Sequence, residues 1–578
     1  MTGPAAPKDP EKARPFFYIL KDKDIFGERQ KDGTGIQFIY ESDGRLINSA
    51  QITGNVTDKE ELTLLETVEG FGRLVHSIGV SVETDRPEET AEFVFQMYGK
   101  KDLYGGGTNL TTSLKCDGME HRIYLSDYRW TEDDHVPGQI KILFAAPERM
   151  GKVSVRLFLN DGYEAPPEEE DLFIDMHSEE YCGMISRSLL QLGNPYRIRK
   201  AIEKSKAGKE VTLAYIGGSI TQGAGAIPIH TECYAYKSFQ LFQNRFSTQN
   251  NVRFIKAGVG GTPSELGMIR FDRDVLREGE RPDIVVIEFA VNDEGDETKG
   301  VCYESLVRKV LKLPWKPAVV LLFSVFANDW NLQERLRPVG DLYDLPMVSI
   351  LNAVTPQFSL KCGEGRILSK NQFFYDIFHP NNTGHTIMAD CLQYLFERCD
   401  AAEPARVGTF VEGMTEEQIL SEKLFGPAVI GADFERIFLL DKKNRYVGAK
   451  IRTGSFTSTD IELQSVEMDG SLTQTPEFPY NWMYDGSRPQ MPGFEMEITC
   501  KSLFLIFKDS GEMDVGKADV FVNDVYCMTA DPHKNNWLHC NAVLLFWETE
   551  SRSHKVRITV TEEDRNKKFT ILGFGYTI

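Results

Sequence analysis

Between residues 211 and 400, strand-like apolar runs alternate with helical ones, and this alternation constrains the fold more than any other feature of the sequence. The apolar runs are VTLAYI, VRFIKAGV, DIVVIEFAV, AVVLLFSVF and PMVSIL, and helical segments such as SELGMIRFDRDVLREG and YESLVRKVLKL separate them. Such alternation is typical of βαβ units, in which a mostly parallel sheet is covered by helices on both faces. We therefore predict a three-layer α/β/α domain over residues 186–403, which begins with the helical segment SRSLLQLGNPYRIRKAIEKSKAGKE.

The regions on either side of this domain have the pattern of β-sandwiches. Residues 16–174 contain short alternating runs such as KVSVRLFLNDG, and similar runs, such as KADVFVNDVYCM and HKVRITVTE, return after Pro404. Turn signals separate these runs, and Asn523–Asp524 predicts a tight hairpin turn. A chain of 578 residues is expected to form several domains. We predict an N-terminal β-sandwich over residues 1–185 and a C-terminal, jelly-roll-like β-sandwich over residues 404–578.

Charge and composition exclude several classes of function. The net charge of -21 argues against nucleic acid or an anionic membrane as the main partner, because those surfaces repel an acidic protein. The amino terminus has no continuous apolar segment and no stretch reaches the length of a membrane span, so we expect a cytoplasmic protein. The ten cysteines lie singly, without a CxxC pair, which predicts free thiols. The histidines are dispersed and no HExxH occurs, so we expect no metal.

Ser219 is the first candidate catalytic residue. It follows the apolar run VTLAYI and the pair Gly217–Gly218, which lets the chain turn sharply and expose the next side chain. Ser219 is thus predicted at the carboxyl end of a strand, where open α/β sheets bind their ligands. Most Gly-Ser dipeptides are turns, so this segment alone leaves a purely structural role open.

Later segments supply the other groups that a serine nucleophile needs. His379 in DIFHP is a candidate base, and Asp376, three residues earlier, can accept the other imidazole N–H. Gly261 in AGVGGTPS can bring its backbone N–H close to a substrate, and Asn292 in FAVNDEG can aim a side-chain N–H at the same point. Taken singly, these residues also fit a helix-entry turn, a polar strand end and a surface Asp–His pair.

Together these segments resemble the SGNH hydrolases, also called the GDSL-like esterase and lipase family, whose landmark residues are Ser, Gly, Asn and His in that order. GGSIT, AGVGGTP, VND and DIFHP match the four blocks of the family over roughly 200 residues. The resemblance implies a catalytic triad of Ser219, Asp376 and His379, and an oxyanion hole formed by Ser219, Gly261 and Asn292. It also implies that neither a metal nor an organic cofactor is required.

The sequence departs from the family pattern at three positions. Gly218 stands where the serine block commonly has Asp, a change found on the carbohydrate-esterase side of the family. Ala290 replaces the glycine of GxND, and Lys256 replaces the frequent Asn before the glycine block, which puts a hydrogen bond there in doubt. Thr221 excludes the GxSxG elbow of α/β-hydrolases, and no complete GxGxxG or P-loop motif occurs.

The layout resembles microbial carbohydrate O-acetylesterases that join an SGNH domain to β-sandwiches. This resemblance implies a serine esterase that removes acetyl groups from oligosaccharides such as acetylated xylan or mannan fragments. Two alternatives stay open: a general acyl esterase or lipase, and a noncatalytic glycan-binding protein. The aromatic side chains of PEFPYNWMYDGSRP fit either a sugar-contacting surface, which would make the C-terminal domain carbohydrate-binding-like, or a loop over a β core. We expect NDEGDET to be a solvated loop and His385 to pack beneath the DIFHP loop.

Overall fold

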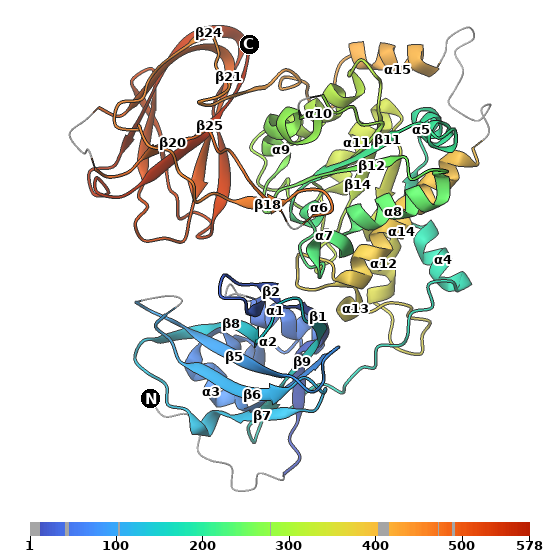
Figure 1. Cartoon of the computed structure of the whole chain (residues 1–578), viewed down its shortest axis with the longest axis vertical. Coiled ribbons are helices and arrows are strands. Elements are labelled where there is room, and N and C mark those ends of the chain that lie inside the picture. The colour runs from blue at the N-terminus through green and yellow to red at the C-terminus, as the bar shows by residue number, and fades with distance from the viewer. Residues whose placement is uncertain are drawn as a thin grey trace.

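The central sheet, formed by the middle part of the chain, has six strands, and five of them are the predicted apolar runs (Figure 1). The sixth, at residues 189–191, lies in the segment that was predicted to be helical, so that prediction was wrong for these residues. The structure is a computed structural model that describes residues 12–40, 45–101, 105–277, 279–402, 416–471, 473–487 and 492–578. The strand order is β10 (Leu189–Gln191), β15 (Met347–Ser349), β14 (Ala318–Phe323), β13 (Ile284–Glu288), β11 (Val211–Gly217), β12 (Val252–Gly258). All pairs are parallel except β10 with β15, so the predicted parallel sheet gains an antiparallel edge strand.

Helices cover both faces of this sheet, which confirms the three-layer arrangement. On one face lie α4 (Glu179–Ser186), α5 (Tyr196–Lys206), α8 (Tyr234–Phe246), α12 (Ile350–Phe358) and α14 (Asn382–Asp400). On the other lie α9 (Ser264–Phe271), the π-helical turn η3 (Asp272–Leu276), α10 (Val301–Leu311) and α11 (Gln333–Tyr343). Side chains on a strand point alternately to the two faces of the sheet. In β11, Leu213 and Tyr215 lie in the hydrophobic core on the first face, and Ala214 and Ile216 lie in the core on the second, so both faces need a covering layer.

The N-terminal region is β-rich, as predicted, and consists of two antiparallel sheets. One has the order β1 (Phe16–Phe26), β9 (Met150–Leu159), β4 (Val75–Thr84), β7 (His121–Tyr124). The other has the order β2 (Glu28–Arg29), β3 (Gly35–Tyr40), β8 (Asp134–Phe144), β5 (Thr90–Gly99), β6 (Asn109–Lys115). The sequence did not predict α1 (Arg45–Thr53), α2 (Lys59–Thr63) and α3 (Val68–Leu74), although Asp58 and Thr67 cap the last two.

The C-terminal region is β-rich too, and eight of its described strands form one continuous sheet. The order is β16 (Phe438–Leu440), β25 (Phe569–Thr577), β21 (Phe494–Asp509), β24 (His539–Val560), β22 (Ala518–Val522), β23 (Val525–Ala530). In addition, β17 (Ala449–Arg452) pairs with β21, and β20 (Trp482–Tyr484) pairs with β25. The long pair β21–β24 joins the two halves of the sheet. The predicted hairpin turn is confirmed, since Asn523 and Asp524 both have positive φ between β22 and β23.

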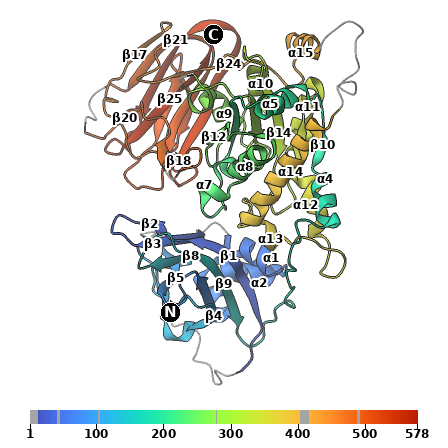
Figure 2. The same cartoon turned by 45° about the vertical axis from the view of Figure 1, so that its right-hand side comes forward.

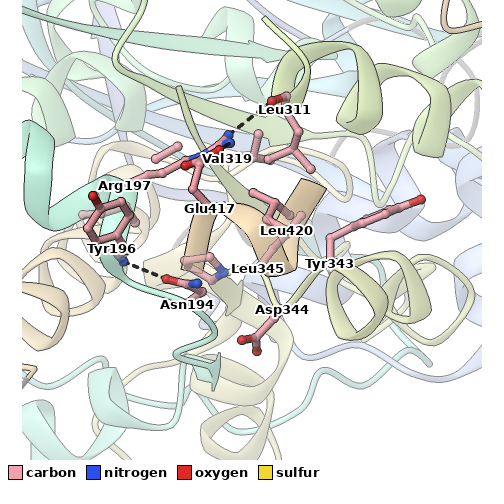
Figure 3. Close-up of a pocket in the computed structure, with 13 residues that line it drawn as sticks. Asn194, Tyr196, Arg197, Leu311, Val319, Tyr343, Asp344, Leu345, Glu417 and Leu420 are labelled. Atoms are coloured by element: carbon pink, nitrogen blue, oxygen red, sulfur yellow. Dashed lines mark hydrogen bonds and ion pairs between the residues drawn. The ribbon is translucent and has the colours of Figure 1, made fainter. Parts of the chain in front are cut away.

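Two helices lie across the predicted domain boundaries. Helix α4 straddles the boundary at residue 185 and packs on α14, where Tyr181 Oη donates to Asp390. Helix α15 (Glu416–Phe425), expected to lie in the C-terminal β domain, packs on the α/β domain and buries Leu424 there. Between α15 and α5 lies a cavity of about 30 Å³, lined by Arg197 and Leu420 among others (Figure 3), which is room for little more than a water molecule.

The C-terminal sheet and the α/β domain share one hydrophobic core. Phe504, Ile506 and Leu572 of the sheet are buried in the same cluster as Leu266 and Ile269 of α9. Both cartoon views show the sheet standing beside this helix (Figures 1 and 2). The shared burial couples the two regions through the hydrophobic effect, so they are not independent globules joined by a linker.

A hairpin from the C-terminal region lies along the open edge of the central sheet. The hairpin consists of β18 (Ser465–Glu467) and β19 (Gln474–Pro476). The Asp469 carboxylate in its turn accepts the backbone N–H of Lys256 in β12 at 2.8 Å and pairs with Arg277 at 2.9 Å. The last strand of the central sheet is therefore covered by a segment more than 200 residues later in the chain.

The aromatic run of the C-terminal region is mostly core. Phe478, Trp482 and Tyr484 are buried, whereas Tyr480 is 44% exposed. Three of the four residues are therefore core residues and not a sugar-contacting surface, but Trp482 and Tyr484 belong to strand β20 and not to the expected loop. Within the described parts of the chain, no helix combines the length and the apolar character needed to cross a membrane.

Candidate active site

Ser219 lies where the sequence placed it, at the carboxyl end of β11, and begins the short helix α6 (Ser219–Gln222). The two preceding glycines are required by crowding. A Cβ on Gly217 would overlap the Thr221 side chain, and one on Gly218 would overlap the Asn292 amide. The close approach of Asn292 therefore requires glycine at position 218.

His379 and Asp376 complete a chain of hydrogen bonds that starts at Ser219. Ser219 Oγ lies 3.0 Å from His379 Nε2, and His379 Nδ1 lies 2.9 Å from Asp376 Oδ2. An ionised carboxylate only accepts hydrogen bonds, so Nδ1 carries the proton and Nε2 is free to accept the hydroxyl proton of Ser219. The second Asp376 oxygen accepts the backbone N–H groups of Phe378 and His379, which fixes the carboxylate within its own turn.

The two predicted oxyanion residues lie beside Ser219. The Asn292 side chain contacts Gly218, the residue before the serine, and a Cβ on Gly260 would be 4.0 Å from Ser219 Cβ. Gly261 has a φ of +71°, a conformation that favours glycine. Among the described residues, the Asn292 Oδ1 atom has no hydrogen-bond partner. The structure thus brings together Ser219, Gly261, Asn292, Asp376 and His379, while their catalytic roles stay predictions.

The C-terminal region contributes side chains that the sequence analysis missed. A Cβ on Gly261 would lie 2.8 Å from His539 Nε2 and 2.9 Å from Trp537 Cζ2, and Gln464 Nε2 donates to the Gly260 carbonyl at 3.1 Å. His539 is buried, which lowers its pKa, whereas Trp537 is 41% exposed. No local motif marks these residues, because the contact joins segments almost 280 residues apart.

Two neighbouring side chains hold the serine turn. Lys256, whose hydrogen bonding was in doubt from the sequence, donates from Nζ to the carbonyl of Gln222, the last residue of α6, at 2.9 Å. The cation thus lies at a helix carboxyl end, where it is favoured. His385 accepts the Tyr234 N–H and bonds the Ala224 carbonyl, and burial lowers its pKa to about 3. His385 is therefore neutral and buried, as expected, and does not serve as a second base.

A buried carboxyl lies under the serine turn. Glu288 ends β13, and its side chain accepts a hydrogen bond from Thr221 at 3.1 Å. Burial raises the pKa of Glu288 from 4.5 to about 7, although hydrogen bonds from Ser324 and Thr221 and the charge of His379 act in the opposite direction. The floor of the site therefore holds a group that titrates near neutral pH.

The acidic segment NDEGDET is exposed at Glu294 and Glu297, but the expectation of a solvated loop was wrong for its two aspartates. Asp293 and Asp296 are fully buried, and the Asp293 carboxylate accepts the Ser264 N–H at 2.7 Å. Burial and the charge of Asp296 raise the pKa of Asp293 to about 8 and that of Glu265 to about 10. Asp296 accepts the backbone N–H groups of Thr298 and Gly300 within its own turn, and the Glu265 carboxylate of α9 accepts the Glu297 N–H.

Comparisons with known proteins agree with this geometry. Residues 215–387 match the model of the GDSL-like Lipase/Acylhydrolase family, which confirms the resemblance for this part of the chain and supports a carboxylic ester hydrolase. No curated protein sequence matches the chain. A two-domain esterase (CEX) described as active on acetylated mannans is 24% identical over 68% of this chain and 98% of its own, with a TM-score of 0.54. The same esterase co-crystallised with mannopentaose is 23% identical, with equal coverage and a TM-score of 0.53. These two likenesses show a common fold.

Replacement of single site residues tests the hydrogen-bonded chain. We expect Ser219→Ala and His379→Ala to lower kcat on 4-nitrophenyl acetate by about 10⁴-fold or more. The first removes the proposed nucleophile and the second the proposed base, and no other residue of the site can take over either role. Asn292→Ala should lower it by about 10²- to 10³-fold through loss of one oxyanion donor. Ser186→Ala, at an exposed serine, is the control and should keep wild-type activity. Full activity of Asn292→Ala would remove that residue from the site.

The buried carboxyl of Glu288 predicts a pH dependence of stability. Its pKa in the folded protein is raised, so its contribution is complete below pH 4.5 and is lost as the pH rises through about 7. Relative to Glu288→Gln, the wild-type free energy of unfolding should fall by about 2.5 kcal/mol between pH 5 and pH 8. Urea denaturation at both pH values measures this difference, and the exposed control Glu203→Gln should parallel wild type. An equal change in the free energy of unfolding between the two pH values for wild type and Glu288→Gln would contradict the raised pKa of Glu288.

Proposed function

We propose that the protein is a serine esterase that removes O-acetyl groups from oligosaccharides. The observation that carries this proposal is the chain of hydrogen bonds from Ser219 through His379 to Asp376 at the carboxyl end of β11, with lengths of 3.0 and 2.9 Å. In this mechanism, His379 Nε2 takes the hydroxyl proton while Ser219 Oγ attacks the acetyl carbonyl carbon. Asp376 stabilises the resulting imidazolium through the hydrogen bond at Nδ1.

The oxyanion of the tetrahedral intermediate is stabilised, in this proposal, by the backbone N–H groups of Ser219 and Gly261 and by the side-chain amide of Asn292. Collapse of the intermediate breaks the bond to the sugar oxygen, which takes its proton from His379. A water molecule, deprotonated by His379, then attacks the acyl-enzyme, and acetate and free Ser219 are released. The contact of Asn292 with Gly218 and the positive φ of Gly261 support these roles.

A carbohydrate ester is the favoured substrate class. Trp537 exposes an aromatic ring beside Gly261, and such a ring suits the C–H faces of a sugar ring. The fold shared with the mannan-active esterase supports the same class, and acetylated mannan or xylan fragments are our proposed substrates. We further propose three domains with β-sandwich character in the outer two, the first boundary lying before α4.

The substrate proposal predicts release of acetate from acetylated oligosaccharides. Mass spectrometry of acetylated xylo-, manno- and pectic oligosaccharides should show loss of acetyl groups with the wild-type protein and not with Ser219→Ala. Activity on 4-nitrophenyl esters should fall from acetate to chains longer than butyrate. A preference for the longer chains would indicate a general acyl esterase or lipase. Equal rates for wild type and Ser219→Ala would indicate a noncatalytic protein.

If the Trp537 ring binds sugar, its loss should weaken the binding of acetylated oligosaccharides but not of a small ester without a sugar. Trp537→Ala should raise KM for acetylated oligosaccharides about tenfold, which corresponds to about 1.4 kcal/mol of lost binding, without a matching change in kcat. Hydrolysis of 4-nitrophenyl acetate should stay within about twofold of wild type, since this ester has no sugar to stack. Trp547→Ala, at a tryptophan of similar exposure (42%), is the matched control. An unchanged KM for oligosaccharides would contradict the role of Trp537.

A further inference from the structure

The turn that carries Asp376 and His379 is held from outside the α/β domain, by the N-terminal β-rich region. We propose that Lys23 in β1 is a positioning residue for this turn, and that the N-terminal region thereby forms part of the esterase site. This inference rests on the proposed function, because it assigns Lys23 a role in orienting the pair that activates Ser219.

The contacts of the Lys23 ammonium group end on the backbone just before Asp376. Lys23 Nζ donates to the carbonyl of Phe374 at 2.5 Å and to that of Asn371 at 3.1 Å. These carbonyls lie at the end of the short helix α13 (Lys370–Phe373). The Lys23 side chain is only 2% exposed, so both bonds are made in a site shielded from water. A buried carbonyl without a hydrogen-bond donor is unfavourable. These two bonds therefore restrict the position of the backbone at Asn371 and Phe374.

The backbone that Lys23 binds is hydrogen-bonded to the other end of the turn that contains Asp376 and His379. The Tyr375 N–H donates to the His379 carbonyl at 2.8 Å, and Phe374 forms a β-bridge with Pro380. Any shift of the Phe374 carbonyl therefore moves the two ends of the turn that contains Asp376 and His379. Because the Ser219–His379 hydrogen bond requires the imidazole in one place, a small displacement of this turn alters proton transfer.

Further bonds from the N-terminal side point to the same segment. Tyr375 Oη donates to the carbonyl of Ile39 in β3 at 3.2 Å. Asn371 Nδ2 donates to the Asp171 carboxylate at 2.8 Å, just after the N-terminal sheets. Figure 2 shows α13 directly above α1 and β1 of the N-terminal region. Several hydrogen bonds from the N-terminal side thus converge on residues 371–375.

Charge is consistent with this role. Burial lowers the pKa of Lys23 to about 8, while Asp171, Asp24 and Asp376 favour its charged form. The group is therefore a cation at neutral pH, and the negative charge of Asp376 is one of those that favour it. A neutral side chain of the same length would lose both the two hydrogen bonds and this charge.

The test compares Lys23→Met with Lys21→Met. Lys21 lies on the same strand and donates to the Glu169 carbonyl at 2.8 Å, away from the catalytic turn. On 4-nitrophenyl acetate, Lys23→Met should lower kcat by about 10- to 100-fold at nearly constant KM, and Ser219 should react with phenylmethylsulfonyl fluoride more slowly by a similar factor. Lys21→Met should stay within about twofold of wild type in both measurements. Circular dichroism and the melting temperature establish that each variant is folded at the assay temperature.

Two results would overturn the inference: a lowered melting temperature of Lys23→Met with kcat unchanged, or an equal loss of kcat in Lys21→Met. If Lys23→Met does not fold, Lys23→Gln, which keeps one donor, takes its place; a fall in kcat of at least about threefold supports the inference and wild-type kcat contradicts it. Wild type compared with Ser219→Ala on the same ester tests the esterase proposal itself. Failure of that proposal is therefore distinguishable from failure of the role of Lys23.

Discussion

The close packing at the end of β11 is the constraint on which the rest of the site depends. Gly217 and Gly218 leave room only for the Thr221 and Asn292 side chains that press against them. Arg270, fully buried, donates to the Gly217 carbonyl at 2.8 Å and to the Ala257 carbonyl at 2.7 Å, which ties this strand end to β12. Interiors packed at this density do not deform gradually, so the serine that follows is held in one orientation.

The site that results is assembled from distant parts of the chain. Ser219, the proposed nucleophile, follows β11, and His379, its proposed base, lies 160 residues later. Trp537, beside Gly261, comes from the C-terminal region, and Lys23, which bonds the backbone before Asp376, comes from the first strand of the chain. Both flanking β-rich regions therefore contact the proposed site.

Much of the α/β domain could be predicted from the sequence, because its signals are local. Five buried strands are recognisable as apolar runs, and three of the four motif blocks lie at the ends of those strands, while DIFHP lies in the turn between α13 and α14. The rest depends on contacts between regions. Asp293 and Asp296 look like solvated acids in the sequence, and only the fold shows that they bond buried backbone. Trp537 and Lys23 lie in no recognisable motif, because the residues that they contact at the site are hundreds of positions away in the sequence.

The hairpin along β12 has a consequence for how the α/β domain could exist alone. An uncovered edge strand offers unpaired backbone groups to any other chain, and proteins avoid this exposure because it leads to edge-to-edge association. Here Asp469 meets the backbone of Lys256 on that edge, and Phe504 and Ile506 cover the apolar face beside it. A catalytic domain cut free of its C-terminal partner would carry both an open edge and a bare apolar face. We therefore expect the α/β domain, produced without the C-terminal region, to self-associate through this edge and face.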